Sequence, residues 1–224
     1  MKVRRRRGIL AVAVLVLCVL LLCGCTGRNV QSPPADTAPR IYGADERAAL
    51  FEQLASKFEN PDVHYKLARS FRGDGLWAQA KYHLETALRF DPANRPSQAA
   101  LVKLLTDSGR EAEASDLANR FINQVDSSAT ETLKLASAFR DEGLDEYALL
   151  CYQQAARIAP DEPDSYRQMG YYYLSKGDED KAKEYFKKSF SLDPSQADVA
   201  AELGRLGVMV HIVRDSNSTT ENSG

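Results

Sequence analysis

Apolar and small residues recur along this chain at fixed places in a strict period. In each period a large apolar residue is followed four positions later by an aromatic or leucine side chain, a spacing that places both on one face of a helix. A glycine comes next, then an alanine with another apolar residue four positions after it. Four periods align without insertion or deletion. Their columns are Leu67, Leu101, Leu135 and Met169; Phe71, Leu105, Phe139 and Tyr173; Gly75, Gly109, Gly143 and Gly177; Ala80, Ala114, Ala148 and Ala182; and Leu84, Ala118, Tyr152 and Phe186.

Each period predicts a pair of helices joined by a tight turn. The glycine stands just beyond the first helical face, where helices commonly end in a left-handed turn that a side chain makes costly. The alanine is small enough to let the paired helices approach closely. Proline ends the second helix in three periods, at Pro92, Pro160 and Pro194, because it lacks a backbone N–H and clashes with the preceding turn. The expected fold class is therefore all-α.

This combination resembles the tetratricopeptide repeat, a helical hairpin whose period matches the spacing of these columns. The resemblance covers residues 61–196 and implies a right-handed α-solenoid of four stacked hairpins. The second unit is degenerate, because Leu105 replaces the aromatic residue, Ala118 is small and Asp126 stands where proline is expected. The four units are 61–94, 95–128, 129–162 and 163–196.

Helix starts agree with this register. Asn60 before Pro61 and Asp62 is typical of an N-cap followed by a first-turn proline and carboxylate. Ser128, with Glu131 three residues later, predicts a capping box.

Two further helices are expected to cover the ends of the array, since a solenoid needs its terminal apolar faces closed. The opening helix is predicted over residues 44–60 and the closing helix over 197–207. Residues 208–224 are predicted to comprise a short apolar segment and a disordered polar tail. The β-branched run 208–213 either folds back over the last hairpin or adds as a strand to a partner's sheet.

The segment before Cys25 differs in kind from the repeats. Lys2 and Arg4–Arg7 form a basic start and Ile9–Leu22 an apolar stretch, as in a secretory signal peptide. The stretch is shorter than the roughly 20 residues that span a bilayer, which favours cleavage over an uncleaved single-span anchor. The sequence Leu22-Cys23-Gly24-Cys25 resembles a bacterial lipoprotein box, which implies removal of residues 1–24 and lipidation of Cys25.

The lipoprotein resemblance implies a lipid anchor in the membrane of a bacterial cell envelope. Several acyl chains hold a protein to a bilayer longer than one chain does. Thr26, rather than aspartate, resembles lipoproteins sent to the outer membrane, on its periplasmic side, in a bacterium with two membranes. Residues 25–43, which include Pro33 and Pro34, are predicted to be a flexible tether.

Charge and cysteine content narrow the choice of partners. Removal of residues 1–24 leaves 24 basic and 31 acidic side chains, a net charge of −7, which disfavours nucleic acid as a ligand. With Cys25 lipidated, Cys151 has no disulfide partner. Because it adjoins Tyr152 on a packing helix, we expect it to be a small buried hydrophobic residue.

A candidate binding face follows from the resemblance, in which the first helix of each unit lines the concave side of the array. The positions that this implies for a ligand lie two before, two after and five after the leading apolar column. Six of them are cationic and none is acidic. The candidate partner-binding residues are Tyr65, Arg69, Arg72, Lys103, Arg140, Arg167, Tyr171 and Arg205. The same positions also hold Ala99, Thr106, Leu133, Ser137 and Leu174.

A basic groove with tyrosines suits an extended partner segment that carries carboxylates. The alternative is a solvated face whose cations pair with nearby acids, each exposed pair being worth about 0–1 kcal/mol. Those acids are Asp62, Asp107, Asp141, Asp164 and Glu202. The lysine–asparagine clamp of chaperone-binding repeats is not matched, because Tyr65, Arg69 and Ala100 stand at its positions.

The sequence gives little support to catalysis. His64, His83 and His211 have no metal-ligand spacing, and neither a phosphate-binding loop nor a nucleophile elbow is present. We expect no enzyme activity, cofactor, metal or small-molecule substrate. Resemblance to tetratricopeptide lipoproteins implies a scaffold that binds protein partners in the envelope and assists pilus, secretin or outer-membrane assembly. The alternative is a regulator or recruiter of a cell-wall hydrolase.

Overall fold

The computed structural model describes residues 43–210, and within them all regular structure is helical. The predicted signal peptide, Cys25 and nearly all of the predicted tether lie outside these residues, as does the tail from residue 211. The helices of the described part are α2 (Ala44–Ser56), α3 (Pro61–Gly73), α4 (Trp77–Phe90), α5 (Arg95–Asp107), α6 (Glu111–Gln124), α7 (Ala129–Asp141), α8 (Asp145–Ile158), α9 (Pro163–Ser175), α10 (Glu179–Leu192) and α11 (Ala197–Arg205).

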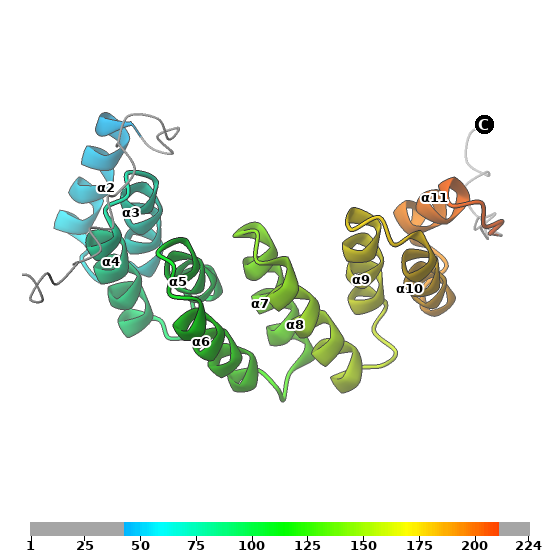
Figure 1. Ribbon diagram of the computed structural model, residues 1–224. Coiled ribbons are helices and arrows are strands. Elements are labelled where there is room, and N and C mark those ends of the chain that lie inside the picture. The colour runs from blue at the N-terminus through cyan, green and yellow to red at the C-terminus, as the bar shows by residue number, and fades with distance from the viewer. Residues whose placement is uncertain (1–42, 211–224) are drawn as a thin grey trace, which may run out of the picture. The chain divides into compact units, whose positions relative to one another are not determined.

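The helix boundaries repeat with the period of the sequence. Helices α3, α5, α7 and α9 have 13 residues each and begin at a constant interval, while α4, α6, α8 and α10 have 14 residues each and keep the same interval. The hairpins α3–α4, α5–α6, α7–α8 and α9–α10 follow one another in chain order (Figure 1). The predicted all-α solenoid of helical hairpins is confirmed.

The glycine column makes the turn of every hairpin. Gly75, Gly109, Gly143 and Gly177 have φ between 71° and 76°, the left-handed region in which other residues lose roughly 1–2 kcal/mol. In the first hairpin the Gly75 N–H donates to the Arg72 carbonyl (3.0 Å) and the Leu76 N–H to the Phe71 carbonyl (2.9 Å). These bonds satisfy carbonyls at the end of α3 that have no partner within the helix.

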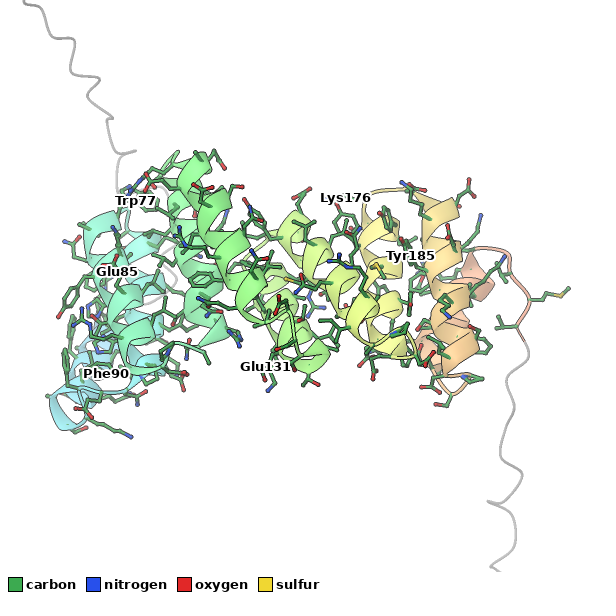
Figure 2. The ribbon with its side chains drawn as sticks, turned by 90° about the horizontal axis from the view of Figure 1, so that it is seen from below. Trp77, Glu85, Phe90, Glu131, Lys176 and Tyr185 are labelled. Carbon is green, nitrogen blue, oxygen red and sulfur yellow. The ribbon has the colours of Figure 1, made fainter. Side chains whose placement is uncertain are left out.

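The predicted caps are confirmed at one helix and half confirmed at another. The Asn60 side chain accepts hydrogen bonds from the backbone N–H groups of Asp62 and Val63 at the start of α3. The Ser128 hydroxyl oxygen accepts from the Glu131 N–H at 3.3 Å. The Glu131 carboxylate, whose side chain is labelled in Figure 2, does not return the bond to Ser128. It pairs instead with Arg95 of the preceding hairpin at 3.0 Å and with Lys134.

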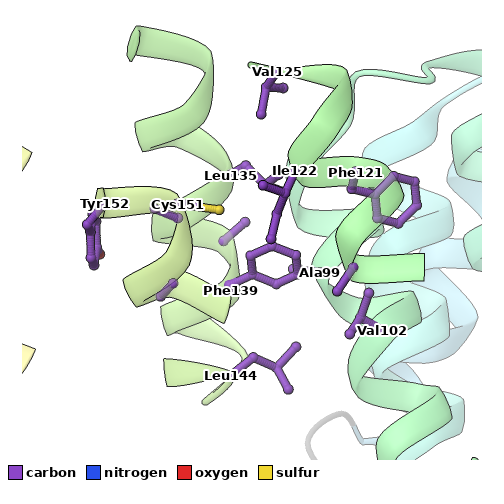
Figure 3. Close-up of a cluster of buried hydrophobic side chains, with 14 of the residues drawn as sticks. Ala99, Val102, Phe121, Ile122, Val125, Leu135, Phe139, Leu144, Cys151 and Tyr152 are labelled. Carbon is purple, nitrogen blue, oxygen red and sulfur yellow. The ribbon is translucent and has the colours of Figure 1, made fainter. Parts of the chain in front are cut away.

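The largest hydrophobic cluster joins the second and third hairpins. Phe139 of α7 is fully buried among side chains of α5, α6 and α8, which include Val102, Ile122 and Cys151 (Figure 3). Cys151 is buried as predicted, and burial raises the pKa of its thiol to about 12. Because the thiolate is the reactive form, this thiol is inert in the folded protein.

The degenerate second hairpin joins the third without a closing proline. Val125, which follows α6, is 3% exposed, and the Thr132 hydroxyl oxygen of α7 lies 2.8 Å from its carbonyl oxygen. At this junction the first helices of the two hairpins, α5 and α7, pack against each other. At the neighbouring junctions the second helix of one hairpin packs against the first helix of the next, as α4 does with α5 and α8 with α9. The buried valine and the threonine hydrogen bond therefore hold the connection that proline-ended units make by stopping the helix.

Short helices cover the ends of the array. Leu50 and Leu54 of α2 pack against Val63 and Leu67 of α3.

In the described residues 43–210, no helix is both long enough and apolar enough to cross a membrane.

At the C-terminal end, Val199 and Leu203 of α11 pack with Phe186 of α10, and Val208 and Val210 add partly buried side chains to the same cluster. These contacts favour the folded-back alternative for residues 208–210.

Candidate functional site

The structure places most of the predicted binding residues on the first helices of the hairpins. Tyr65, Arg69 and Arg72 lie on α3, Lys103 on α5, Arg140 on α7, Arg167 and Tyr171 on α9, and Arg205 on α11. Each is half-buried or exposed. Ala99, which the same pattern assigned to this face, is instead fully buried in the core, because α5 packs against both α4 and α7.

At the N-terminal end of this face, the residues are already bound to acidic side chains. The Tyr65 hydroxyl donates to Glu142 Oε1 at 3.2 Å, and Arg72 Nη2 donates to Glu142 Oε2 at 2.7 Å. Lys103 Nζ lies 2.7 Å from Asp107, whose other oxygen lies 3.9 Å from Arg72. Glu142 is only 7% exposed. Burial, followed by the charge of Glu142, raises the pKa of Tyr65 to about 12.

Arg69 differs from its neighbours. Its guanidinium lies 5.8 Å from the centroid of the Tyr65 ring, and its Nε is buried without a hydrogen-bond partner. Within residues 43–210 it makes no ion pair, unlike the other five predicted cations. Arg69 is therefore the cation of this face with the most capacity left for a ligand.

The C-terminal end of the face contains a cavity of about 550 Å³, here named the α9 cavity. Arg140 Nη1 donates to Gln168 Oε1 across it at 2.8 Å. Arg167 lies 2.6 Å from Asp164 and 3.6 Å from Asp198. The lining residues are Arg140, Asp145, Ala148, Tyr152, Arg167, Gln168, Tyr171, Tyr172, Ser175 and Asp198.

Two tyrosines give the α9 cavity its polar interior. The Tyr171 hydroxyl donates to Asp198 at 3.0 Å, and burial together with this bond raises its pKa to about 12. Tyr152 is 3% exposed, and its hydroxyl makes no hydrogen bond of normal geometry among the described residues, although the Arg140 guanidinium lies near it. Burial raises the Tyr152 pKa, and the nearby Arg140 opposes that shift.

The predicted residues are thus brought together in two groups rather than one continuous row. Tyr65, Arg72 and Lys103 form one group with Glu142 and Asp107, and Arg140, Arg167 and Tyr171 line the α9 cavity. Arg205 is exposed, pairs with Glu202 at 3.2 Å and does not line the cavity. Acidic side chains pair with five of the six predicted cations, which is the arrangement that the alternative interpretation describes. Pairing with Asp107, Asp141, Asp164 and Glu202 was foreseen as the alternative, and Glu142 and Asp198 were not.

A second cavity, of about 580 Å³, lies among the second helices and carries less charge. Arg157 is the one charged residue of its lining, which otherwise contains amide and apolar side chains such as Gln153 and Leu150, together with two tyrosines. No three His, Cys, Asp or Glu side chains within residues 43–210 come together as a metal ion would require. The α9 cavity is therefore the better candidate for binding a charged segment.

Part of the chain matches a known family of helical repeats. Residues 163–196, which contain α9 and α10, match the model of the tetratricopeptide repeat family. The other three hairpins reproduce the helix boundaries of this unit at the same constant interval. The chain is a tetratricopeptide-repeat protein. Its repeats carry the candidate face on their first helices, which is where the resemblance placed it.

The chain is also similar to individual proteins. It is 28% identical to the type IV pilus assembly protein PilF of Pseudomonas aeruginosa over 158 residues, which are 66% of this chain and 60% of that relative. The chain thus spans less than two thirds of the relative's length.

Among solved structures, MamA is 23% identical with a TM-score of 0.39 (69% of this chain, 91% of that one). YrrB, titled a tetratricopeptide-repeat protein with an unusual peptide-binding site, is 18% identical with a TM-score of 0.39 (72% and 82%). The structure of PilF from Pseudomonas aeruginosa is 24% identical with a TM-score of 0.39 (67% and 69%).

Proposed function

We propose that this protein is an interaction scaffold of the bacterial cell envelope. In this proposal the first-helix face binds an extended, acidic segment of a partner protein, and the lipid on Cys25 holds the repeats near a membrane. The mature domain is acidic overall, so its cations on one face are a local exception that favours an acidic ligand.

The α9 cavity is the observation that carries the proposal. It has room for side chains of a partner, and it combines two arginines and two aspartates with tyrosine rings. Arg167 is paired with Asp164 and Asp198, so Arg140 is the cation better placed to meet a partner's carboxylate. The buried Tyr152 hydroxyl has no partner among the described residues, and Arg140 is about half exposed beside it. Arginine and a hydroxyl are donors that a carboxylate accepts from, and tyrosine rings supply contact area. The cavity therefore suits an acidic residue flanked by apolar ones.

Pilus assembly is the envelope process that we favour for this scaffold. The support is the similarity to PilF, whose name describes a type IV pilus assembly protein. The predicted signal peptide and lipoprotein box agree with an envelope location. Secretin or outer-membrane assembly would use the same face and the same anchor.

Charge reversal on the face tests the proposal. Arg69→Glu combined with Arg140→Glu should remove the partner from material that co-purifies with the protein out of detergent-solubilised envelope, as measured by quantitative mass spectrometry. The matched control combines Arg89→Glu with Arg157→Glu, two exposed arginines on the second helices, and changes net charge by the same amount. An unchanged set of co-purified proteins in the Arg69/Arg140 variant would contradict the proposed face.

A further inference from the structure

The Glu142 carboxylate links two hairpins that are not neighbours in the chain. Glu142 caps the end of α7 in the third unit, whereas Tyr65 and Arg72, which it accepts from, lie on α3 in the first. Helix α5 of the second unit comes between them in the order of first helices (Figure 1). The contact therefore bridges positions 70 and 77 residues apart on the predicted binding face.

The turn after α7 holds this carboxylate in place. Gly143 has φ 71°, Leu144 behind it is 7% exposed, and its N–H donates to the Phe139 carbonyl at 2.8 Å. The same place in the other three turns is held by Asp74, Ser108 and Lys176. Asp74 also reaches back, to Arg47 of α2. Only the third unit places the longer glutamate here, and only that side chain reaches across a whole unit among the described residues.

The hydrogen bonds that Glu142 accepts indicate which chemical group this part of the face can bind. A guanidinium and a phenol each donate to one oxygen of the carboxylate, at 2.7 and 3.2 Å. Charge-assisted bonds of this kind are about twice as strong as neutral ones. The Arg72 side chain is 13% exposed and that of Glu142 3%, so the pair is shielded from water. A carboxylate from another chain would find the same two donors, with Arg69 beside Tyr65 as a second cation.

We infer that Tyr65 and Arg72 form a carboxylate-binding subsite that Glu142 fills while the protein is free. This inference rests on the proposed function and adds its regulation: an acidic side chain of the partner takes the place of Glu142 when it binds. Because Glu142 belongs to the same chain, its carboxylate competes for the subsite at a high effective concentration. The free protein should therefore bind acidic segments more weakly than a protein whose subsite is empty. Release of Glu142 also unlinks the first and third hairpins on this face.

Removal of the Glu142 charge tests the subsite. The full-length chain in detergent is titrated against a fluorescein-labelled peptide of alternating aspartate and serine, with fluorescence anisotropy as the readout. Glu142→Gln should bind this peptide about tenfold more tightly than the unmodified chain, because the internal competitor has lost its charge. Adding Arg72→Gln to this variant should abolish the gain. Equal affinities of the unmodified chain and Glu142→Gln, or a gain that survives loss of Arg72, would overturn the inference.

Two controls separate the subsite from other effects. Glu146→Gln removes the same charge from an exposed side chain on α8 and should leave affinity unchanged, so an equal gain there would overturn the inference. If Glu142→Gln does not fold by circular dichroism, Glu142→Asp keeps the charge but shortens the reach, and a gain of about threefold is expected. No gain in that variant would also overturn it. The proposed function is judged separately, by the Arg69/Arg140 co-purification.

Discussion

A pair of buried histidines joins the two helices of the first hairpin. His64 Nδ1 lies 2.9 Å from His83 Nδ1, and His64 Nε2 lies 2.9 Å from the Phe58 carbonyl oxygen. The carbonyl can only accept, so His64 carries its proton on Nε2 and its Nδ1 accepts from the His83 Nδ1–H. The rings of Phe71 and Phe90 stack on them, and Tyr82 is the titratable neighbour. This arrangement requires a neutral His64, because its Nδ1 has to accept.

The histidine pair predicts acid sensitivity of the first hairpin. Burial, followed by the proximity of His64, lowers the pKa of His83 to about 4 from the ordinary value of 6.5. The unfolded chain therefore binds more protons between these values, and stability present above pH 6.5 is lost as the pH falls toward 4. We expect the free energy of unfolding to fall by roughly 2–3 kcal/mol between pH 7 and 4.5 through this group, measured by urea titration.

His83→Asn provides the control for this pH dependence. The asparagine amide has a donor near the place of Nδ1 but does not titrate. The variant should therefore lose less stability than the unmodified chain over the same pH range, while carboxylates contribute equally to both. Identical pH profiles of the two proteins would show that His83 is not the group responsible.

At the scale of elements, the two helices of the last hairpin come closest where a glycine of one meets a phenylalanine ring of the other. Gly170 in α9 faces Phe186 of α10, and a Cβ built on Gly170 would lie 2.5 Å from ring carbons of Phe186, a fully buried side chain. Gly204 in α11 is also helical, but nothing lies within 4 Å of the Cβ position there. The two glycines therefore have opposite roles: one provides space for a neighbour, and the other only weakens its helix.

Alanine at these two positions should shift stability in opposite directions. Gly170→Ala forces Phe186 to move and should destabilise the protein by about 1–3 kcal/mol. Gly204→Ala should stabilise it slightly, by up to about 1 kcal/mol, since alanine is the better helix former. Thermal unfolding followed by circular dichroism measures both. Unchanged stability of the Gly170→Ala variant would contradict a tight contact between α9 and α10 at this position.

The helices could be predicted from the sequence, because each hairpin buries the same columns and the period has no gaps. Glu142 could not be assigned its role, since it stands in a turn, outside every helical column, and its partners are 70 and 77 residues away. Tyr152 belongs to a packing column, and that position in the sequence does not reveal that the residue also lines a cavity. Ala99 was misplaced because the pattern of a first helix does not show which neighbouring helices will cover it.

At the scale of the whole described array, the predicted binding face has two parts, of which one is occupied by Glu142 and the other contains an open cavity. Tyr65 and Arg72 are held by Glu142, while the α9 cavity retains space and a tyrosine hydroxyl without a partner among the described residues. A partner segment would enter through the α9 cavity and then compete with Glu142 toward the first hairpin. This order is expected because the α9 cavity has open space, whereas the Arg72–Glu142 pair is shielded from water.

The most direct test of this account is photocrosslinking in living cells from each face. A photoreactive phenylalanine at Ser175, exposed at the α9 cavity, should form an adduct with a partner protein. The same residue at Leu150, 45% exposed beside the second cavity, should form little or none. The adduct from Ser175 should also diminish when Arg69 and Arg140 are reversed. Adducts from Leu150 without any from Ser175 would contradict binding on the first-helix face.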